Sequence, residues 1–244
     1  MIFRKIIDIC DTVTDAAALI LCLIVLLIGL YSVYDSYMMI HSATDDSILK
    51  YKPGYDGPLE EEDKEILPSM VAWLSIDGTK IDYPVMQGQD NMEFLNKNPF
   101  GEYSLAGSIF LDCSNKADFS DPYSLIYGHH MEEGAMFGPL DDYIRQEFLE
   151  DHSKGHLIVN DDRYDILFYA SFHADATNKS VFSPSEQDGR EVLIYAKQHA
   201  LSILPEHAPK KKDRILALST CRYPESIERT VVIGVLKEQK QAKL

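Results

Sequence analysis

The feature that most constrains this chain is an uninterrupted apolar run near its N-terminus. Residues 16–34, AAALILCLIVLLIGLYSVY, carry no charge. As an α-helix, a run of this length spans roughly 28 Å, which is about the thickness of the hydrocarbon core of a bilayer. The run therefore predicts either a transmembrane anchor or the apolar part of a cleavable signal peptide.

The residues around the run favour a retained anchor. A signal peptide has a shorter apolar region and a small-x-small cleavage site, whereas this sequence continues DSYMMIHSATDD. Arg4 and Lys5 precede the run and several aspartates follow it. The positive-inside tendency then places residues 1–15 in the cytoplasm and everything after residue 34 outside. We expect a single-pass protein of the cell membrane with an extracytoplasmic domain.

Charge and cysteine content exclude several other classes of protein. The net charge of −16 argues against a nucleic-acid partner, because a phosphate backbone needs a basic surface. The four cysteines lie at positions 10, 22, 113 and 221 and form no Cys-x-x-Cys pair, so a structural zinc site is not expected. A disulfide between Cys113 and Cys221 outside the cell stays open at this point.

The segment after the anchor divides into an extension and a folded domain. Residues 35–69 are mixed and acidic, and we expect a helix continuing from the anchor, a turn at Pro53 to Pro58, and a short helix from about Leu59 to Leu67. Residues 70–240 form the domain. Most of its signals are short runs rich in β-branched and aromatic residues. These runs are VAWLSI, KIDYPVM, GSIFLD, YSLIYG, GHLIVN, RYDILFYASF, DRILALS and RTVVIGVL.

A few helices are expected on the outside of these strands. DNMEFLN and FGPLDDYIRQEFLED have the composition of short helices, and a longer helix is expected from about Glu186 to Leu204, with Ser183 or Ser185 as its N-cap. The fold class is therefore mainly β. We predict a mainly antiparallel, closed barrel of about eight strands with peripheral helices, an N-terminal helical extension and one transmembrane helix.

The stretch ALSTCRYPESIER, from Ala217 to Arg229, is the first candidate for chemistry. Strand alternation puts Ser219 and Cys221 on one face and Thr220 on the other. If the strand beginning at Arg229 pairs antiparallel with it, Cys221 and Arg229 oppose each other, with Cβ atoms about 5 Å apart. A guanidinium there favours a thiolate and faces charge developing beside the sulfur. The alternative is an inert thiol, because free cysteines are often buried.

A second pattern supplies a proton carrier. SLIYGHHMEEGAMFGPLDDY runs a hydrophobic strand into Gly128 and two adjacent histidines. A histidine just past a strand, after a glycine that lets the backbone turn, lies on the rim where a cleft forms. It could act as acid and base for a cysteine nucleophile. Only one of His129 and His130 can point that way in an extended backbone, and alternation does not decide which.

Together, the apolar anchor, YGHH followed by GAMFGPLDDY, and LSTC followed by an arginine eight residues later resemble the sortases, and most of all the class B sortases. The resemblance covers roughly residues 70–237. The helical segment before the domain and the helix expected before the cysteine strand also resemble class B features. The resemblance implies a sortase-type β-barrel.

What the resemblance implies about function is a cysteine transpeptidase of Gram-positive bacteria that needs no metal or organic cofactor. Cys221 would be the nucleophile and His129 the proton donor and acceptor, while Arg229 would hold the substrate and stabilise the oxyanion. The substrates would be secreted proteins with an LPxTG-like C-terminal sorting signal, which is cleaved after its threonine. A thioester would then pass the protein to an amine of the cell-wall peptidoglycan.

The same resemblance extends to the peptide groove. Ser219 and Thr220, beside the cysteine, look like part of the groove. Asn91 and Leu95, on the helix expected at DNMEFLN, resemble positions that line the sorting-signal pocket. Tyr127 and Asp112 are interpreted as structural residues.

Two other functions stay open. A pilin-polymerising sortase would share the mechanism but accept a lysine side chain of another protein subunit. The sequence has no lid with an Asp-Pro-Trp or similar plug before the domain, which favours wall anchoring. A catalytically silent, membrane-tethered binding module would use the same barrel. In that module Cys221, His129 and Arg229 need not converge.

Overall fold

The computed structural model describes residues 2–43, 46–55, 57, 65–160, 162–221 and 227–239. The chain separates into two compact units, Met1–Ser42 and Ala43–Leu244.

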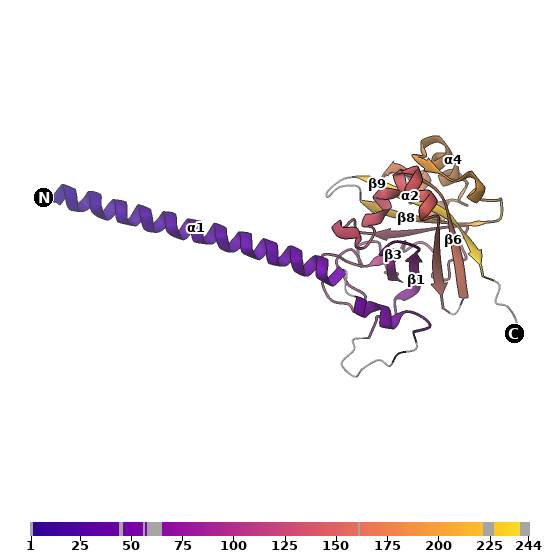
Figure 1. The fold of residues 1–244 in the computed structure, drawn as a ribbon, viewed down its shortest axis with the longest axis horizontal. Coiled ribbons are helices and arrows are strands. Elements are labelled where there is room, and N and C mark those ends of the chain that lie inside the picture. Colours follow the sequence, from indigo (N-terminus) through magenta and orange to yellow (C-terminus); the bar gives the residue numbers. More distant parts are fainter. Residues whose placement is uncertain are drawn as a thin grey trace. The chain divides into compact units, whose positions relative to one another are not determined.

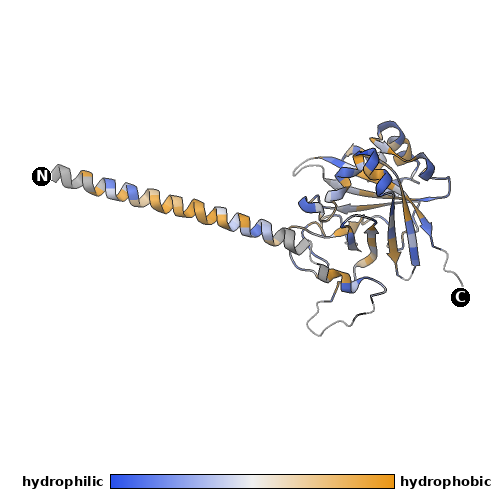
Figure 2. Cartoon of the chain, viewed as in Figure 1, coloured by the Kyte–Doolittle hydropathy of each residue, from blue (hydrophilic) through white to orange (hydrophobic). Residues whose placement is uncertain are grey.

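The first unit is one long helix. Helix α1 runs from Ile2–Ala43 and includes the whole expected span. The stretch Asp11–Met38 is long and apolar enough to cross a membrane, and Figure 2 shows its hydrophobic centre. Its large apolar side chains are exposed around the whole helix, from 43% at Met38 to 71% at Leu19. A helix that is apolar all round has no face suited to water, as expected of a membrane span.

The second unit begins with a short extension that is attached to the domain. A 3₁₀ segment, Asp46–Tyr51, leads into the expected turn at Pro53. Lys52 Nζ lies 2.8 Å from an Asp82 carboxylate oxygen, and Trp73 Nε1 donates to the same carboxylate at 2.6 Å. The helix expected from Leu59 to Leu67 lies mostly outside the described residues, and residues 65–67 are not helical.

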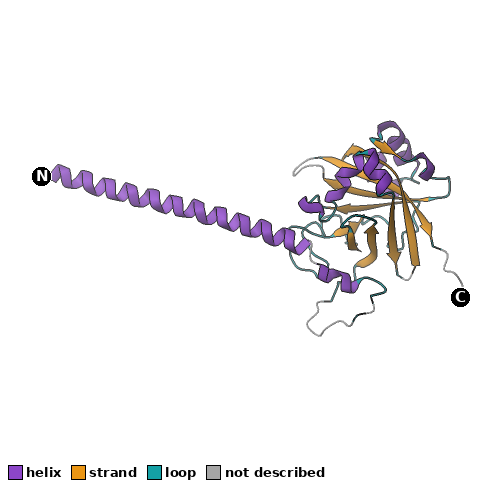
Figure 3. Cartoon of the chain, in the orientation of Figure 1, coloured by secondary structure: helices purple, strands orange, loops and turns teal. Residues whose placement is uncertain are grey.

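The domain is a closed β-barrel, as predicted (Figures 1 and 3). Eight strands follow one another in the order β5-β1-β2-β3-β4-β8-β9-β6, and a further pairing of β5 with β6 closes the ring, while the two-residue strand β7 lies on the far side of β6. Most pairings are antiparallel, but β2 with β3 and β4 with β8 are parallel. The strands are β1 Met70–Ile76, β2 Asp82–Met86, β3 Ile109–Leu111, β4 Tyr123–Gly128, β5 Lys154–Val159, β6 Asp162–Asp175, β7 Ser202–Ile203, β8 Arg214–Cys221 and β9 Glu228–Glu238.

The helices are shorter than the sequence predicted. The segment FGPLDDYIRQEFLED forms a 3₁₀ helix, Gly138–Ile144, and then α2, Gln146–Asp151. The other short elements are 3₁₀ segments at Glu132–Gly134, Pro184–Glu186 and Pro205–His207, and helix α3 at Lys179–Phe182.

The helix expected from Glu186 to Leu204 is α4, which spans only Arg190–His199. Its N-cap is Gly189, at φ 84°, so the prediction of Ser183 or Ser185 was wrong. A glycine in the left-handed conformation changes the direction of the chain there and prevents an earlier start. At the other end, β7 pairs with β6, which ends the helix.

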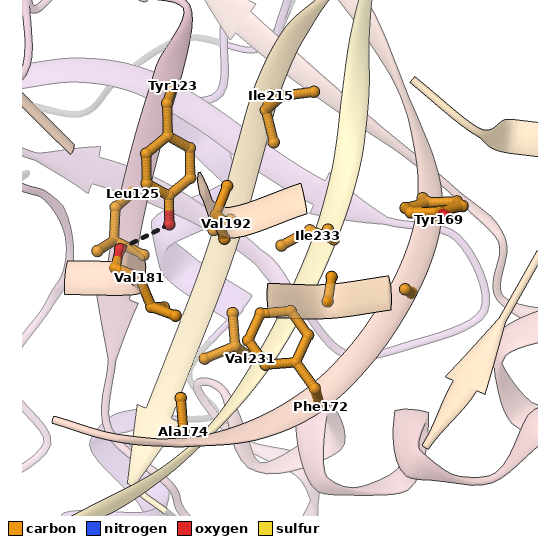
Figure 4. Close-up of a cluster of buried hydrophobic side chains, with 13 residues drawn as sticks. Tyr123, Leu125, Tyr169, Phe172, Ala174, Val181, Val192, Ile215, Val231 and Ile233 are labelled. Carbon is orange, nitrogen blue, oxygen red and sulfur yellow. Dashed lines mark hydrogen bonds between the residues drawn. The ribbon is translucent and has the colours of Figure 1, made fainter. Parts of the chain in front are cut away.

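Helices α3 and α4 cover one face of the sheet formed by β4, β8, β9 and β6 (Figure 4). Tyr123 crosses this layer and its hydroxyl donates to the Val181 carbonyl oxygen at 2.8 Å. The covered face includes the odd-numbered residues of β8 and β9: Ile215, Ala217, Val231 and Ile233. The same face continues, along β8 and backwards along β9, towards Cys221 and Arg229.

Candidate active site

A cavity of about 310 Å³ lies where this covered face ends. It is lined by residues from the ends of β4, β8 and β9, from β3 and α3, from the segment after β6 and from the segment between β2 and β3. The lining residues are Asn91, Met92, Leu95, Phe110, Tyr127, Gly128, His129, Ala176, Phe182, Ser219, Thr220 and Arg229. Six of the seven residues proposed from sequence for catalysis or substrate binding therefore border one cavity.

The seventh, Cys221, is placed by its backbone. In the antiparallel pair of β8 and β9, Cys221 lies opposite Arg229, as alternation predicted. Arg229 also lies opposite Ala174 of β6, whose side chain belongs to the covered face. This register puts Arg229 and position 221 at the cavity end of that face. The Cys221 side chain and residues 222–226 lie outside the described part of the chain.

His129 reaches the same end of the sheet through β4. The parallel pairing of β4 and β8 sets Gly128 beside Thr220, so His129 follows one step further, in line with Cys221. Gly128 allows close packing there, because an added Cβ would lie 2.4 Å from Ile109 Cδ1 and 2.8 Å from the Phe137 ring.

The two adjacent histidines have different surroundings. His129 borders the cavity, and its Nε2 lies 2.7 Å from the Leu95 carbonyl oxygen. Nδ1 of His130 lies 3.2 Å from Asp141 Oδ2, which is an ion-pair distance without hydrogen-bond geometry. Thr230 donates its hydroxyl proton to the other oxygen of Asp141. Because Thr230 follows Arg229 in β9, its side chain points to the opposite face of the sheet, and His130 belongs with it.

A buried carboxylate supports one wall of the cavity. Asp112 is 3% exposed, and its Oδ2 accepts from Asn91 Nδ2 and from the Tyr127 hydroxyl, each at 2.9 Å. Its other oxygen accepts from the backbone and side chain of Ser114. The Asn91 amide is fixed from both ends, since its oxygen accepts from the backbone N–H of Cys113 at 2.8 Å. Asp112 is structural as predicted, and through these bonds it also positions two residues of the cavity.

The segment that carries Asn91 and Leu95 is a turn, so the helix expected at DNMEFLN was wrong. Asp90 Oδ1 accepts from the backbone N–H groups of Met92 and Glu93, and Leu95 N–H donates to the Met92 carbonyl at 3.2 Å. Helix nucleation costs free energy that only further helical residues offset, so a segment this short forms a turn and not a helix.

Two residues that border the cavity have buried hydroxyl groups. Ser219 and Thr220 are each 1% exposed, and among the described residues neither hydroxyl has a hydrogen-bond partner. Buried hydroxyls normally bond to protein, water or ligand. Ser219 shares the face of β8 that carries Cys221.

Cys113 is a free thiol, so the Cys113–Cys221 disulfide left open by the sequence is not present. Burial, followed by the charges of Asp112 and Asp90, raises the pKa of the Cys113 thiol, which disfavours its reactive thiolate. Among the described residues, no group of three or more metal-ligating side chains comes together.

Sequence reasoning missed several lining residues, above all Tyr127, which it placed among purely structural residues. Strand alternation held the signal, because Tyr127 and His129 are two positions apart and face the same side. Phe110, Met92, Ala176 and Phe182 had no such signal, since long-range packing brings them to the cavity.

Comparison with known proteins agrees with this fold. A family model for the sortase domain matches residues 74–237. Sortase B of Staphylococcus aureus is 31% identical over 181 residues, which cover 72% of this chain and 74% of that protein. Two solved structures are also similar. A Streptococcus pyogenes class B sortase involved in pilus biogenesis has a TM-score of 0.64 and 37% identity, covering 70% of this chain and 94% of that one. A Staphylococcus aureus sortase B–substrate complex has a TM-score of 0.65 and 29% identity, covering 71% and 82%.

The closed barrel matches the solved sortase B structures, and the chain belongs to the sortase family of cysteine transpeptidases. Within that family it is a class B sortase.

Replacing Tyr127 by phenylalanine is expected to reduce the loss of stability in alkaline solution. Burial, and then the charge of Asp112, raises the pKa of Tyr127 far above that of an ordinary phenol. In the unfolded chain this group ionises at about pH 10, while the folded protein keeps its proton. The free energy of unfolding therefore falls above about pH 10 by about 1.4 kcal/mol per pH unit for this group, and Tyr127→Phe removes that share.

The measurement is denaturant unfolding of the full chain in detergent micelles at a series of alkaline pH values. Tyr103→Phe is the matched control, because Tyr103 is 76% exposed. Equal slopes in the two variants would contradict the expectation.

Proposed function

We propose that this chain is a membrane-anchored cysteine transpeptidase that joins secreted proteins to the cell wall. The observation that carries the proposal is the arrival of three chain segments at one cavity. These are the end of β4 with His129, the end of β8 at Cys221, and the start of β9 with Arg229. In this proposal Cys221 is the nucleophile, His129 the proton donor and acceptor, and Arg229 the oxyanion partner.

The reaction balances without any cofactor. His129 takes the thiol proton of Cys221, and the sulfur attacks the main-chain carbonyl carbon of the threonine in the sorting signal. Arg229 stabilises the negative charge that develops on the carbonyl oxygen. The C–N bond then breaks, His129 gives its proton to the departing amine, and a thioester remains. An amine of the acceptor attacks that thioester and loses a proton to His129. The C–S bond then breaks, and His129 returns the proton to the sulfur of Cys221.

The charges of the cavity suit a neutral peptide. Arg229 is the only permanently charged side chain among the described lining residues, and none of them is acidic, although the chain as a whole carries a charge of −16. A peptide backbone can use the amide of Asn91, while Leu95, Phe110 and Phe182 offer apolar contact. An LPxTG-like signal has this neutral, partly apolar character. The related sortase B solved with its substrate supports a peptide ligand.

The anchor completes the proposal. With residues 1–15 in the cytoplasm and residues 16–34 in the membrane, residues 35–69 would link the anchor to a catalytic domain, residues 70–240, outside the cell. The secreted substrate is held in the same membrane by its own hydrophobic C-terminus, which would keep it within reach.

The second substrate is proposed to be a peptidoglycan amine. The alternative is a lysine of a pilin subunit, since a similar class B sortase of Streptococcus pyogenes is involved in pilus biogenesis. The two acceptors differ in the group that carries the amine. Offering both to the enzyme together and identifying the product therefore distinguishes the two functions.

The direct test is turnover by the full chain in detergent micelles. We expect it to cleave members of a library of fluorogenic sorting peptides and to join the acyl part to an added amine, and we expect Cys221→Ala to abolish both reactions. Offering a short glycine peptide together with a lysine-containing pilin peptide shows which acceptor is preferred. If wild-type protein cleaved no peptide, with or without an amine, the binding-module alternative would be favoured.

The two histidines form a matched pair of variants. His129→Gln should lower kcat by at least about 10²-fold, because the variant cannot accept or donate the proton. His130→Gln should retain most turnover and instead lower stability, since it loses the contact with Asp141. Peptide cleavage and thermal unfolding, measured on both variants, check this. The opposite pattern would assign the catalytic role to His130.

Arg229→Lys tests the oxyanion role. We expect most activity to be lost, because one ammonium group cannot reproduce the planar set of donors that a guanidinium presents. The loss should appear in kcat/KM for peptide cleavage while the unfolding midpoint stays close to wild type. Near-normal turnover would remove Arg229 from the proposed role.

A further inference from the structure

His129 makes one close polar contact with a main-chain group. Its Nε2 lies 2.7 Å from the carbonyl oxygen of Leu95. A carbonyl oxygen only accepts hydrogen bonds, so Nε2 must carry a proton in this contact. In the neutral ring the lone pair is then on Nδ1.

The Leu95 carbonyl packs closely against a glycine further along the same β2–β3 segment, which leaves room for it. Gly107 has φ +59°, and a Cβ built on it would lie 2.3 Å from the Leu95 oxygen and 2.7 Å from the Phe94 oxygen. The next residue, Ser108, donates its N–H to the Phe94 oxygen at 3.0 Å, which fixes the two segments against each other. Glycine is therefore required here for two reasons: the positive φ angle, and the lack of space for a Cβ atom.

We propose that the Leu95 carbonyl, kept in position by Gly107, is the positioning group for His129. It selects the tautomer with the proton on Nε2 and leaves Nδ1 to exchange protons with the cysteine and the leaving amine. The inference rests on the proposed role of His129 as acid and base. It adds the group that orients the ring and the residue that orients that group.

The proton movements are consistent with this assignment. Nδ1 accepts the thiol proton when the sulfur attacks and releases it to the departing nitrogen, while the other proton stays on Nε2, in its hydrogen bond to the Leu95 carbonyl oxygen, throughout. When both nitrogens are protonated, the negative end of the carbonyl dipole faces the positive ring and stabilises it. The ring keeps one orientation through both half-reactions.

The first test is the tautomer of His129 in the full chain. Protein labelled with ¹⁵N-histidine is placed in detergent micelles in the Cys221→Ala background, and two-bond ¹H–¹⁵N correlations are recorded at about pH 8.5, where ordinary imidazoles are neutral. Signals that disappear in His129→Gln belong to His129. We expect a protonated Nε2 and a bare Nδ1. A protonated Nδ1 would overturn the proposal.

The second test compares two glycines of the same loop. Gly107→Ala should displace the Leu95 carbonyl, populate both tautomers of His129 and lower kcat on the order of 10²-fold, with a smaller change in KM. Gly101→Ala is the matched control. Gly101 also has a positive φ, +86°, but its added Cβ would meet only the Leu67 side chain, at 3.4 Å. It should keep the wild-type tautomer and kcat.

Leu95→Ala separates the side chain from the carbonyl. It removes apolar contact in the cavity, so KM should rise, but the carbonyl remains and the Nε2 proton should persist. If Gly107→Ala folded, as judged by circular dichroism, and kept both tautomer and kcat, the role of Gly107 would be refuted. If it did not fold, the wild-type and Leu95→Ala spectra would still decide whether the carbonyl positions the ring.

The outcomes also distinguish this inference from the proposed function. A protonated Nε2 in a protein that cleaves no peptide would contradict the transpeptidase proposal and support the positioning contact. An active protein with a protonated Nδ1 would support the transpeptidase and contradict the contact.

Discussion

The register between β8 and β9 is the constraint on which the site depends. It sets Cys221 opposite Arg229, and the same ladder continues into the buried pairs of Ala217 with Ile233 and of Ile215 with Val235. A slip by one residue would turn Arg229 to the face now held by Thr230, because side chains alternate along a strand. The hydrophobic layer under α3 and α4 opposes such a slip, so the packing that stabilises the barrel also fixes the geometry of the candidate site.

The local part of this arrangement could be predicted from the sequence. Alternation in ALSTC and RTVVIGV was sufficient to pair Cys221 with Arg229, because a short connection between two strands usually gives an antiparallel pair. The strands themselves followed from β-branched runs between turn residues. The barrel then needed only a way to close, which β5 provides by pairing with both β1 and β6.

What could not be predicted depends on contacts between distant segments. The sequence suggested a histidine on a rim, but the parallel pairing of Gly128 with Thr220 joins residues that no local pattern connects. The predicted length of α4 was wrong for a similar reason. The residues of β7, which were expected to be helical, pair with β6 instead. Asn91 and Leu95 were selected by resemblance. Their actual setting, a turn held by Asp90 and by the buried Asp112, follows from hydrogen bonds that only the folded chain makes.

A charged group and a neutral group orient different residues of the candidate site. In a catalytic triad, the histidine is oriented by a carboxylate. Here the buried carboxylate, Asp112, bonds to Tyr127 and Asn91, and a neutral carbonyl contacts His129. Two unit charges 4 Å apart interact by about 4 kcal/mol near a protein surface, whereas a neutral hydrogen bond contributes about 1 kcal/mol net. A carbonyl can therefore hold the ring without strongly retaining its second proton. That would suit the acid–base role proposed for His129, in which the ring accepts a proton from a thiol and then gives it to an amine.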